Sequence, residues 1–289
     1  MNLLIVGLGS MGKRRARLAK GIDAGLQIFG VDSAEARRTE AKALGLVQDA
    51  WATIGEAAAA ARPDAALVCT APLSHAGIIR ELLEHDLPVF TELNLVRDGY
   101  DENMALARSK GLPLFLSSTM LYRRETQYIK QAVQQFGRPV HYIYHIGQYL
   151  PDWHPWENYK NFFVGNARTG GVREILGIDL PWLLDAFGPV EQMTVQTDSI
   201  SDLGLPYPDC ATLLLRHKGG AQGVLAADVV SRKAVRNFEC FGDGLHLFWE
   251  GNPKALYAFR DGEKQFVDTY QSFEHDSRYS DNIVENAYV

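Results

Sequence analysis

The segment that decides the fold is Asn2-Leu3-Leu4-Ile5-Val6-Gly7-Leu8-Gly9-Ser10-Met11-Gly12. Its run Leu3–Val6 is continuously apolar, which is typical of a parallel strand buried on both faces. Three glycines follow in the pattern G-x-G-x-x-G, and a helix is expected from Gly12 onward. Gly7 permits a tight turn, Gly9 lets the backbone approach a ligand, and Gly12 lets the helix pack close to the strand. The segment therefore predicts a turn that binds a pyrophosphate at a helix N-terminus, with Ser10 and Met11 completing it.

An acidic residue after the next expected strand, Gln27–Val31, agrees with this prediction. Asp32 follows the glycine turn by about 20 residues, the spacing at which a carboxylate reaches the adenosine ribose of a dinucleotide. Such a carboxylate accepts hydrogen bonds from the ribose hydroxyls and repels a 2′-phosphate. The sequence thus predicts NAD as the cofactor. NADP remains the alternative, because Arg37 and Arg38 follow closely.

The chain has two halves with different patterns. In residues 1–118, apolar strands alternate with helical segments, and Thr53 and Glu56 form a capping box before one of these helices. This predicts an α/β Rossmann domain with a doubly wound parallel sheet. In residues 119–289, helices are expected at Arg124–Phe136 and Arg173–Phe187, amid β segments at hairpin-like spacing. That half predicts an α+β domain with a mostly antiparallel open sheet.

Composition excludes several functional classes. Of the 289 residues, 46% are hydrophobic and 22% are charged, as in ordinary globular proteins. The net charge of −6 argues against a nucleic-acid-binding protein. The N-terminus has neither the basic start of a signal peptide nor the length of a membrane span. Cys69, Cys210 and Cys240 are scattered, which suits a reducing cytoplasm and predicts no metal site.

Several further segments resemble the Gfo/Idh/MocA family, named after glucose–fructose oxidoreductase and inositol dehydrogenase. They are Cys69-Thr70-Ala71-Pro72-Leu73-Ser74-His75, Val89-Phe90-Thr91-Glu92, Leu121-Tyr122-Arg123 and Gly170-Gly171-Val172. The resemblance implies an NAD(P)-dependent oxidoreductase that forms a homodimer or homotetramer through the open face of its second sheet. It also implies that residues 119–289 form the domain for substrate binding and oligomerisation. It also implies further cofactor contacts, from Thr70, Ala71, Pro72, His75 and Glu92.

The segment Tyr149-Leu150-Pro151-Asp152-Trp153-His154-Pro155-Trp156 resembles a branch of that family linked to sugar or sugar-nucleotide metabolism. We therefore expect a sugar-type substrate. The residues expected to contact it are Asn94, Tyr122, Arg123, Trp153 and Trp156. For Arg123, an ion pair between domains is an equally good interpretation. The final residues, 286–289, look like the start of the family's last helix.

Two departures from the family pattern concern acid–base chemistry. The family's Glu-Lys-Pro is Glu92-Leu93-Asn94 here, and leucine can neither carry a proton nor orient a substrate. The family's Asp and His on the catalytic helix align with Ile175 and Asp179.

Three residues are candidates for the missing proton transfer: His154, Asp179 and Glu174. His154 titrates near neutral pH, although a structural hydrogen bond in a packed loop is an equal alternative. A carboxylate on an apolar helix needs a partner or water, and Asp179 is expected to face the substrate. Glu174 has the alternative of pairing with Arg173 or facing solvent.

The function predicted from the sequence is an oxidoreductase acting on a hydroxyl or carbonyl group of a sugar, polyol or sugar nucleotide. Two alternatives stay open. One is a dinucleotide-binding protein with a degenerate active site, acting as a sensor or partner subunit. The other is an imine reductase-type relative.

Overall fold

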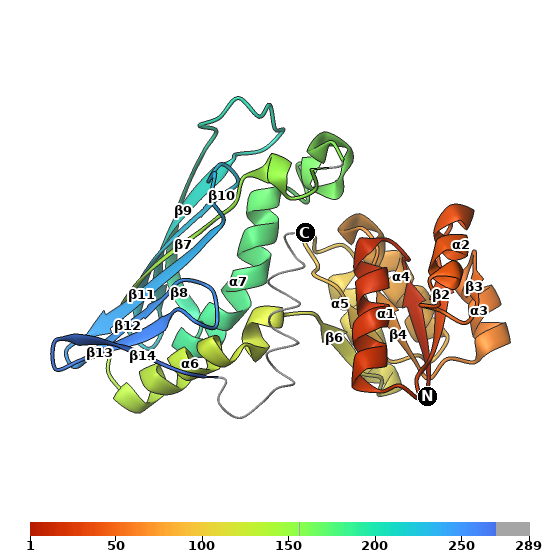
Figure 1. The fold of residues 1–289 in the computed structure, drawn as a ribbon, viewed down its shortest axis with the longest axis horizontal. Helices are drawn as coiled ribbons and strands as arrows, with labels where there is room; N and C mark the ends of the chain where they lie inside the picture. Colours follow the sequence, from red (N-terminus) through yellow and green to blue (C-terminus); the bar gives the residue numbers. More distant parts are fainter. Residues whose placement is uncertain (156, 270–289) are drawn as a thin grey trace. The chain divides into compact units, whose positions relative to one another are not determined.

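The computed structural model describes residues 1–155 and 157–269, which form two compact units (Figure 1). The first unit comprises Met1–Ser117, and the second begins at Ser118. The final residues 286–289, expected to start a last helix, lie outside the described residues. Among the described residues, no helix is both long and apolar enough to cross a membrane.

The first unit is a six-stranded sheet in which every paired strand is parallel. The strands lie in the order β3-β2-β1-β4-β5-β6. Their bounds are β1 Asn2–Val6, β2 Gln27–Val31, β3 Ala50–Trp51, β4 Ala65–Val68, β5 Val89–Thr91 and β6 Leu114–Leu116. The helices are α1 Ser10–Ile22, α2 Glu35–Ala43, α3 Ile54–Ala61, α4 His75–Glu84 and α5 Tyr100–Lys110, with a 3-10 turn, η1, at Pro72–Ser74. This confirms the predicted doubly wound sheet.

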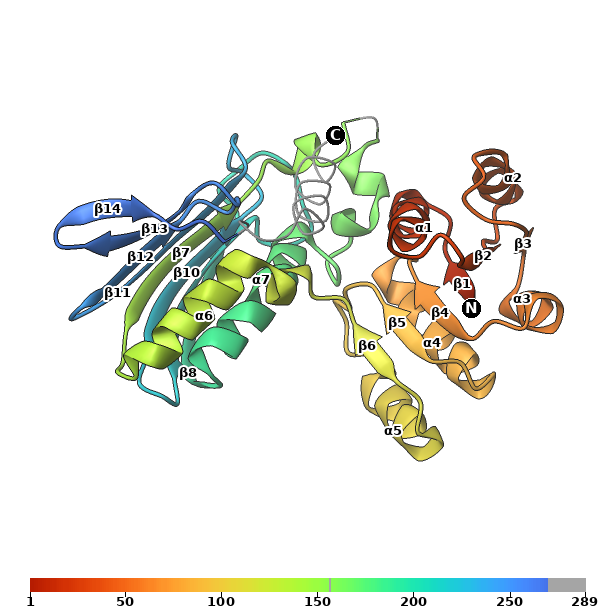
Figure 2. The same cartoon turned by 60° about the horizontal axis from the view of Figure 1, so that its bottom comes forward.

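Apolar cores cover both faces of this sheet, which explains why its strands read as continuous apolar runs. On one face Ile5 and Ile28 pack with residues of α1 and α2. On the other, Leu4 and Val68 pack with residues of α3, α4 and α5. Figure 2 shows α1 and α2 on one side of the strands and α4 on the opposite side.

Local signals set the ends of several elements as predicted. Thr53 and Glu56 form both hydrogen bonds of the capping box at the start of α3. Gly111 adopts a left-handed conformation with φ of 65° and ends α5. Glycine tolerates this conformation because it has no Cβ.

The second unit is an eight-stranded sheet in the order β14-β13-β12-β11-β7-β10-β9-β8. Its strands are β7 His141–Gly147, β8 Val190–Asp198, β9 Cys210–His217, β10 Gln222–Asp228, β11 Val235–Gly242, β12 Leu245–Trp249, β13 Leu256–Arg260 and β14 Glu263–Phe266. Strands β7 and β10 are parallel, and every other pair is antiparallel, which confirms the mostly antiparallel sheet. The helices are α6 Arg124–Phe136 and α7 Gly171–Phe187, with 3-10 turns η2 Thr119–Tyr122, η3 Leu150–Asp152, η4 Tyr159–Asn161 and η5 Phe163–Gly165.

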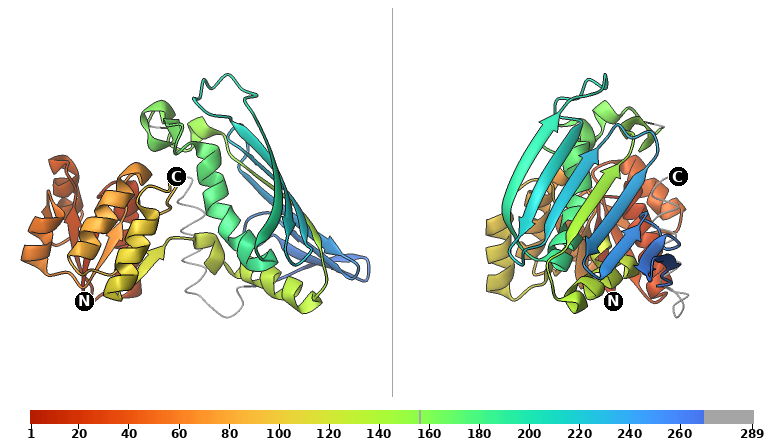
Figure 3. Two further views of the ribbon diagram at one scale, coloured as in Figure 1. Left: turned by 180° about the vertical axis from the view of Figure 1, so that it is seen from behind. Right: turned by 90° about the vertical axis from the view of Figure 1, so that its left-hand side faces the viewer.

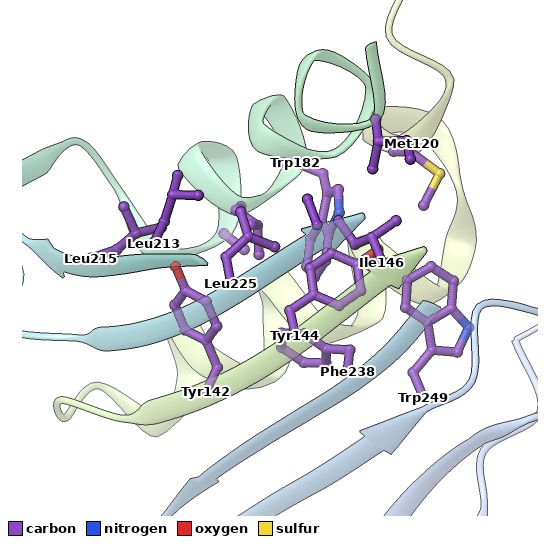
Figure 4. Close-up of a cluster of buried hydrophobic side chains, with 14 of the residues drawn as sticks. Met120, Tyr142, Tyr144, Ile146, Trp182, Leu213, Leu215, Leu225, Phe238 and Trp249 are labelled. Carbon is purple, nitrogen blue, oxygen red and sulfur yellow. The ribbon is translucent and has the colours of Figure 1, made fainter. Parts of the chain in front are cut away.

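An aromatic core lies between this sheet and its helices (Figure 4). Trp182 of α7 meets Phe238 of β11 with ring centroids 5.1 Å apart and Tyr144 of β7 at 5.5 Å. Helices α6 and α7 lie on one face of the sheet (Figures 1 and 3). The other face exposes apolar side chains, including Ile143, Leu214 and Val224.

Candidate functional site

The glycine turn after β1 is closely packed at Gly7 and Gly12 but has open space at Gly9. Gly7 has φ of 95°, and a Cβ there would lie 2.8 Å from the carbonyl of Cys69. A Cβ on Gly12 would lie 1.8 Å from the carbonyl oxygen of Gly7, so only glycine allows α1 to start so close to the strand. By contrast, a Cβ on Gly9, the N-cap of α1, would meet no atom within 4 Å. The turn thus leaves space for an anion at the N-terminus of α1.

This turn sits where the strand order of the sheet reverses. Strand β1 lies between β2 and β4, and ligands of open α/β sheets bind beyond the carboxyl ends of the strands at such a point. The segment after β4 lies against the glycine turn, because a Cβ on Gly7 would approach Cγ2 of Thr70 to 2.8 Å. Ala71 and Pro72 continue this segment into η1. The residues expected from the glycine turn and from the segment after β4 are thus adjacent.

The carboxylate of Asp32 is oriented by backbone amides. Oδ2 accepts a hydrogen bond from the backbone N–H of Leu8 at 2.9 Å, and Oδ1 accepts one from Ala34 at 2.9 Å. The Arg37 guanidinium lies 3.6 Å from Oδ2, whereas Arg38 donates to the backbone carbonyls of Asp32 and Ser33. Asp32 is therefore a buried, fixed negative charge at the end of β2.

His75 is a buried residue that joins the segments after β4 and β5. Its Nε2 donates to the carbonyl of Thr70 at 2.9 Å, and its Nδ1 lies 2.7 Å from Oδ1 of Asn94. Thr91 Oγ1 lies 3.4 Å from the same Nδ1. Both ring nitrogens are used within the protein. Asn94, expected to contact the substrate, contributes its Oδ1 to this network.

Arg15 is a site residue that sequence reasoning missed. It follows Gly12 by one helical turn and donates through Nε to Glu92, while its Nη2 donates to Oγ of Ser117 at 3.1 Å. Its guanidinium also lies 5.3 Å from the ring centroid of Phe90. The available signal was the position of Arg15 one turn after a buried glycine, on the same helix face. Glu92 is thus held in an ion pair that ties α1 to the ends of β5 and β6.

Asp179 does not face an accessible surface as expected, and this is a correction. Its side chain is fully buried and accepts hydrogen bonds from the Tyr144 hydroxyl at 2.6 Å and the Trp182 indole at 3.3 Å. Arg236 adds an ion pair at 3.3 Å. A buried carboxylate requires such partners, and here the partners surround it. Asp179 is therefore the centre of a buried cluster that it forms with Tyr144, Trp182 and Arg236.

Arg123 also has a structural partner. Its Nη2 donates to the fully buried Glu125 at 2.6 Å, and its guanidinium lies 5.5 Å from the Trp249 ring centroid. Arg123 thus forms an ion pair, the alternative to a substrate contact, and its partner lies within the second unit. Tyr122, next to it in η2, is 60% exposed.

The loop that precedes α7 holds the predicted Trp153 and His154. Trp153 packs against the start of α7, where a Cβ on Gly171 would lie 3.4 Å from its ring. The His154 ring meets that of Phe162 edge-on at 4.5 Å. Burial lowers the pKa of His154 below its ordinary value, and nearby Glu157 opposes this shift. Trp156 lies outside the described residues.

Glu174 lies in the first turn of α7, near Tyr207. Its Oε2 atom is inaccessible and has no hydrogen-bond partner among the described residues. Burial raises the pKa of Glu174 to about 8. Tyr207 fixes this end of the helix, because its hydroxyl accepts from the N–H of Gly171 at 3.0 Å and donates to the carbonyl of Val164 at 2.5 Å. Of the predicted acid–base residues, Glu174 alone combines burial with an unpartnered polar atom in the described chain.

The model of the Gfo/Idh/MocA family matches residues 1–117, the extent of the first unit. The family is described as an oxidoreductase family with an NAD-binding Rossmann fold. Among curated proteins, none matches this sequence.

Solved structures share the fold over nearly the whole chain. An oxidoreductase from Agrobacterium radiobacter, in complex with NAD+, L-tartaric acid and magnesium, has a TM-score of 0.78 at 12% identity, covering 99% of this chain and 89% of its own. UDP-N-acetylglucosamine 3-dehydrogenase GnnA from Acidithiobacillus ferrooxidans has a TM-score of 0.75 at 17% identity, with coverage of 99% and 89%. The WlbA dehydrogenase from Bordetella pertussis, in complex with NADH and UDP-GlcNAcA, has a TM-score of 0.77 at 14% identity, with coverage of 100% and 84%. At these identities the similarity shows the fold alone.

Proposed function

We propose that this protein, whose residues 1–117 match the model of the Gfo/Idh/MocA family of NAD-binding oxidoreductases, is an NAD-dependent dehydrogenase for a hydroxyl or carbonyl group of a sugar nucleotide or related sugar. The observation that carries the proposal is the open space above Gly9 at the start of α1, next to the fixed carboxylate of Asp32. Free N–H groups at the helix start favour a pyrophosphate, and the carboxylate favours unmodified ribose hydroxyls.

The residues of the first unit support a dinucleotide cofactor. The turn Gly7–Gly12 would hold the pyrophosphate, Asp32 would bind the adenosine ribose, and the segment Thr70–Pro72 would line the cofactor beyond the reversal of strand order. When bound, NAD supplies the group that accepts or gives a hydride. Because Arg38 is used on backbone carbonyls, it does not offer a ready partner for a 2′-phosphate, which supports NAD over NADP.

The substrate class rests on two kinds of support. GnnA is a dehydrogenase of UDP-N-acetylglucosamine, and WlbA was solved with NADH and UDP-GlcNAcA. In this chain, the loop before α7 holds partly buried aromatic side chains, among them Trp153, Tyr159 and Phe162, and flat apolar rings of this kind can pack against the faces of sugars. Tyr122 and Trp153 remain our proposed substrate contacts.

A spectrophotometric panel tests this function directly. Purified protein is mixed with NAD and a series of UDP-sugars, free sugars and polyols, and separately with NADH and the matching keto compounds. We expect a change at the NADH absorbance band with at least one UDP-sugar. A protein that binds NADH but turns over no member of the panel in either direction would contradict the proposal.

A second candidate is a dinucleotide-binding protein without turnover, and two observations favour it. Leu93 occupies the position of the family's lysine, and Asp179 is enclosed by Tyr144, Trp182 and Arg236. The substitution Leu93→Lys separates the two functions. If the wild type is inactive and Leu93→Lys gains turnover with unchanged NADH affinity, the protein is a degenerate relative. If the wild type is already active, this candidate is excluded.

We further propose that the protein is a homo-oligomer that functions in the cytoplasm. The exposed face of the second sheet carries Ile143, Leu214 and Val224, with exposures of 48%, 53% and 37%. A hollow of about 420 Å³ lies on this face. Contiguous apolar surface of this kind commonly marks a protein interface. The three cysteines are free thiols, which suits a reducing compartment.

A further inference from the structure

The first turn of α7 contains a carboxyl group for which the described residues supply no hydrogen-bond partner at Oε2. Glu174 is half-buried as a residue, and its Oε2 is inaccessible and has no hydrogen-bond partner in the described chain. A buried carboxylate without partners is strongly destabilised relative to its protonated form. The group therefore retains its proton at pH values where an ordinary glutamate has lost it.

Among the described residues, the neighbours of Glu174 do not supply a counter-charge, and burial is what raises its pKa. Tyr207, which lies near it, has a single hydroxyl proton and donates it to the carbonyl of Val164. Asp209, on the same loop, accepts hydrogen bonds from Ser201. These groups are either neutral or acidic, so they favour the protonated form of Glu174.

A second buried polar atom lies close to the same turn. The indole Nε1 of Trp153 is inaccessible and has no hydrogen-bond partner in the part of the chain that the structure describes. The Trp153 ring packs on Gly171, which lies one helical turn before Glu174 on the same helix face. An unpaired donor and an unpaired acid on adjacent segments are a pair of groups that a ligand hydroxyl or carbonyl can satisfy.

We propose that Glu174 is the proton donor of the reaction. It would take the role that the family's lysine and histidine have at the positions of Leu93 and Asp179. The inference rests on the proposed dehydrogenase function. In carbonyl reduction, the substrate carbon receives a hydride, and the substrate oxygen takes the proton of the Glu174 carboxyl group. The product is the alcohol, and the Glu174 carboxylate then regains a proton from water. In the reverse direction the carboxylate accepts the hydroxyl proton.

The alternatives fit this role less well. Burial lowers the pKa of His154, so its ring is neutral at neutral pH and holds no readily donated proton. Asp179 is fully enclosed and paired with Arg236. Glu174, whose pKa burial raises to about 8, holds a proton near neutral pH and can release it.

The first experiment needs neither cofactor nor substrate. The free energy of unfolding is measured by urea denaturation from pH 5 to pH 8 for the wild type, E174Q and the control D185N. The native state binds a proton at Glu174 that the unfolded chain has released, so the wild type loses stability as pH rises above the unfolded pKa. Glutamine does not titrate. We expect E174Q to become progressively more stable than the wild type between pH 5 and pH 8.

D185N controls for loss of an acidic residue on the same helix. Asp185 lies in the last turn of α7 and forms a partly exposed ion pair with Lys130. The difference between D185N and the wild type should stay constant across the same pH range. A constant difference for E174Q as well would mean that Glu174 titrates normally, and this would overturn the proposal.

The second experiment measures carbonyl reduction with NADH and a substrate from the panel. We expect E174Q to lower kcat/KM by ~10²–10⁴-fold, the usual contribution of general acid–base catalysis, while the Kd for NADH is unchanged. The wild-type rate of reduction should fall as pH rises through about 8, and E174Q should lose this dependence. E174D should recover part of the rate, and D185N should match the wild type.

The outcomes separate the two proposals. No turnover by the wild type on the whole panel overturns the dehydrogenase function and this inference together. Turnover by the wild type that persists in E174Q, with the same pH profile, overturns the role of Glu174 alone. If E174Q does not fold, E174D and the wild-type pH profile decide the question, since a flat wild-type profile from pH 6 to pH 9 contradicts the proposal.

Discussion

At the scale of a single side chain, Asp32 is the residue that we propose selects the cofactor. Its carboxylate is held by the amides of Leu8 and Ala34 and carries a negative charge at the end of β2. Asp32→Asn keeps a similar shape but removes the charge. Because hydrogen bonds to charged groups contribute about 1.5–3 kcal/mol, we expect the Kd for NADH to rise about tenfold to a hundredfold. The Kd for NADPH should fall, because the repulsion of its 2′-phosphate is lost.

Isothermal titration calorimetry with both cofactors measures this change in preference. Asp49→Asn is the matched control, because Asp49 is an exposed partner of Lys42 away from the glycine turn. An Asp32→Asn protein with unaltered preference for NADH would show that another group selects the cofactor.

Substitution of Asp179 should lower the free energy of unfolding. Tyr144, Trp182 and Arg236 all point to its carboxylate, so Asp179→Asn leaves Arg236 without its counter-charge. Breaking a buried ion pair in this way costs about 3–5 kcal/mol in the free energy of unfolding. Urea denaturation checks this value. Asp185→Asn, on the same helix but exposed, should change it by less than ~1 kcal/mol.

The role of Asp179 also shows where residue-level reasoning from sequence stops. The alignment of Asp179 with a family histidine gave its position on α7 but not its partners. Trp182 lies on the same helix, but Tyr144 and Arg236 come from β7 and β11, which are distant in the sequence. The same applies to Arg15 and Glu92, which are 77 positions apart. Pairing between distant side chains depends on how strands and helices are brought together, and a local pattern does not contain that information.

Elements were more predictable than partners, because their signals are local. The bounds of α6 match the predicted range Arg124–Phe136, and Gly137 ends it with φ of 67°. The parallel strand β2 also matches its predicted range. Two short strands, β3 and β14, were not predicted. Two residues, as in β3, are too few to establish a hydrophobic period.

The start of α1 allows binding and folding to be tested separately. A Cβ at Gly9 would meet no atom within 4 Å, so Gly9→Ala should fold with nearly unchanged stability. The added methyl group would occupy the space proposed for the pyrophosphate, and we expect the Kd for NADH to rise at least ~10-fold, a loss of about 1.4 kcal/mol. Fluorescence titration with NADH measures the affinity, and thermal unfolding measures the stability.

Gly21→Ala is the control for the same helix. A Cβ at Gly21 also meets no atom within 4 Å, but Gly21 lies at the far end of α1. Alanine there should increase stability by up to ~1 kcal/mol through helix propensity and leave NADH affinity unchanged. Equal affinities for the two variants would argue against a cofactor above Gly9.

At the scale of the whole molecule, the open face of the second sheet is the surface that we propose as the interface between copies of the chain. If this face forms the proposed interface, Leu214→Lys places a charge in it, and the oligomer should dissociate to single chains. Light scattering after size-exclusion chromatography measures the mass. Ile22→Lys, at a residue 79% exposed at the end of α1, should leave the mass unchanged. A wild-type mass equal to one chain would contradict the proposed oligomer from the outset.

The parallel pairing of β7 with β10 has a consequence for co-translational folding. Strand β7 lies in the middle of its sheet, with β10 on one side and β11 on the other, and both neighbours are encoded far downstream. The nascent chain therefore exposes the edges of β7 throughout synthesis of α7, β8 and β9. Non-local pairing of this kind slows folding and prolongs the time during which aggregation-prone intermediates are exposed. During synthesis of the second half there is thus an interval in which chaperones can bind the chain. All strands of the first unit, by contrast, have been synthesised by the time that Ser117 is added.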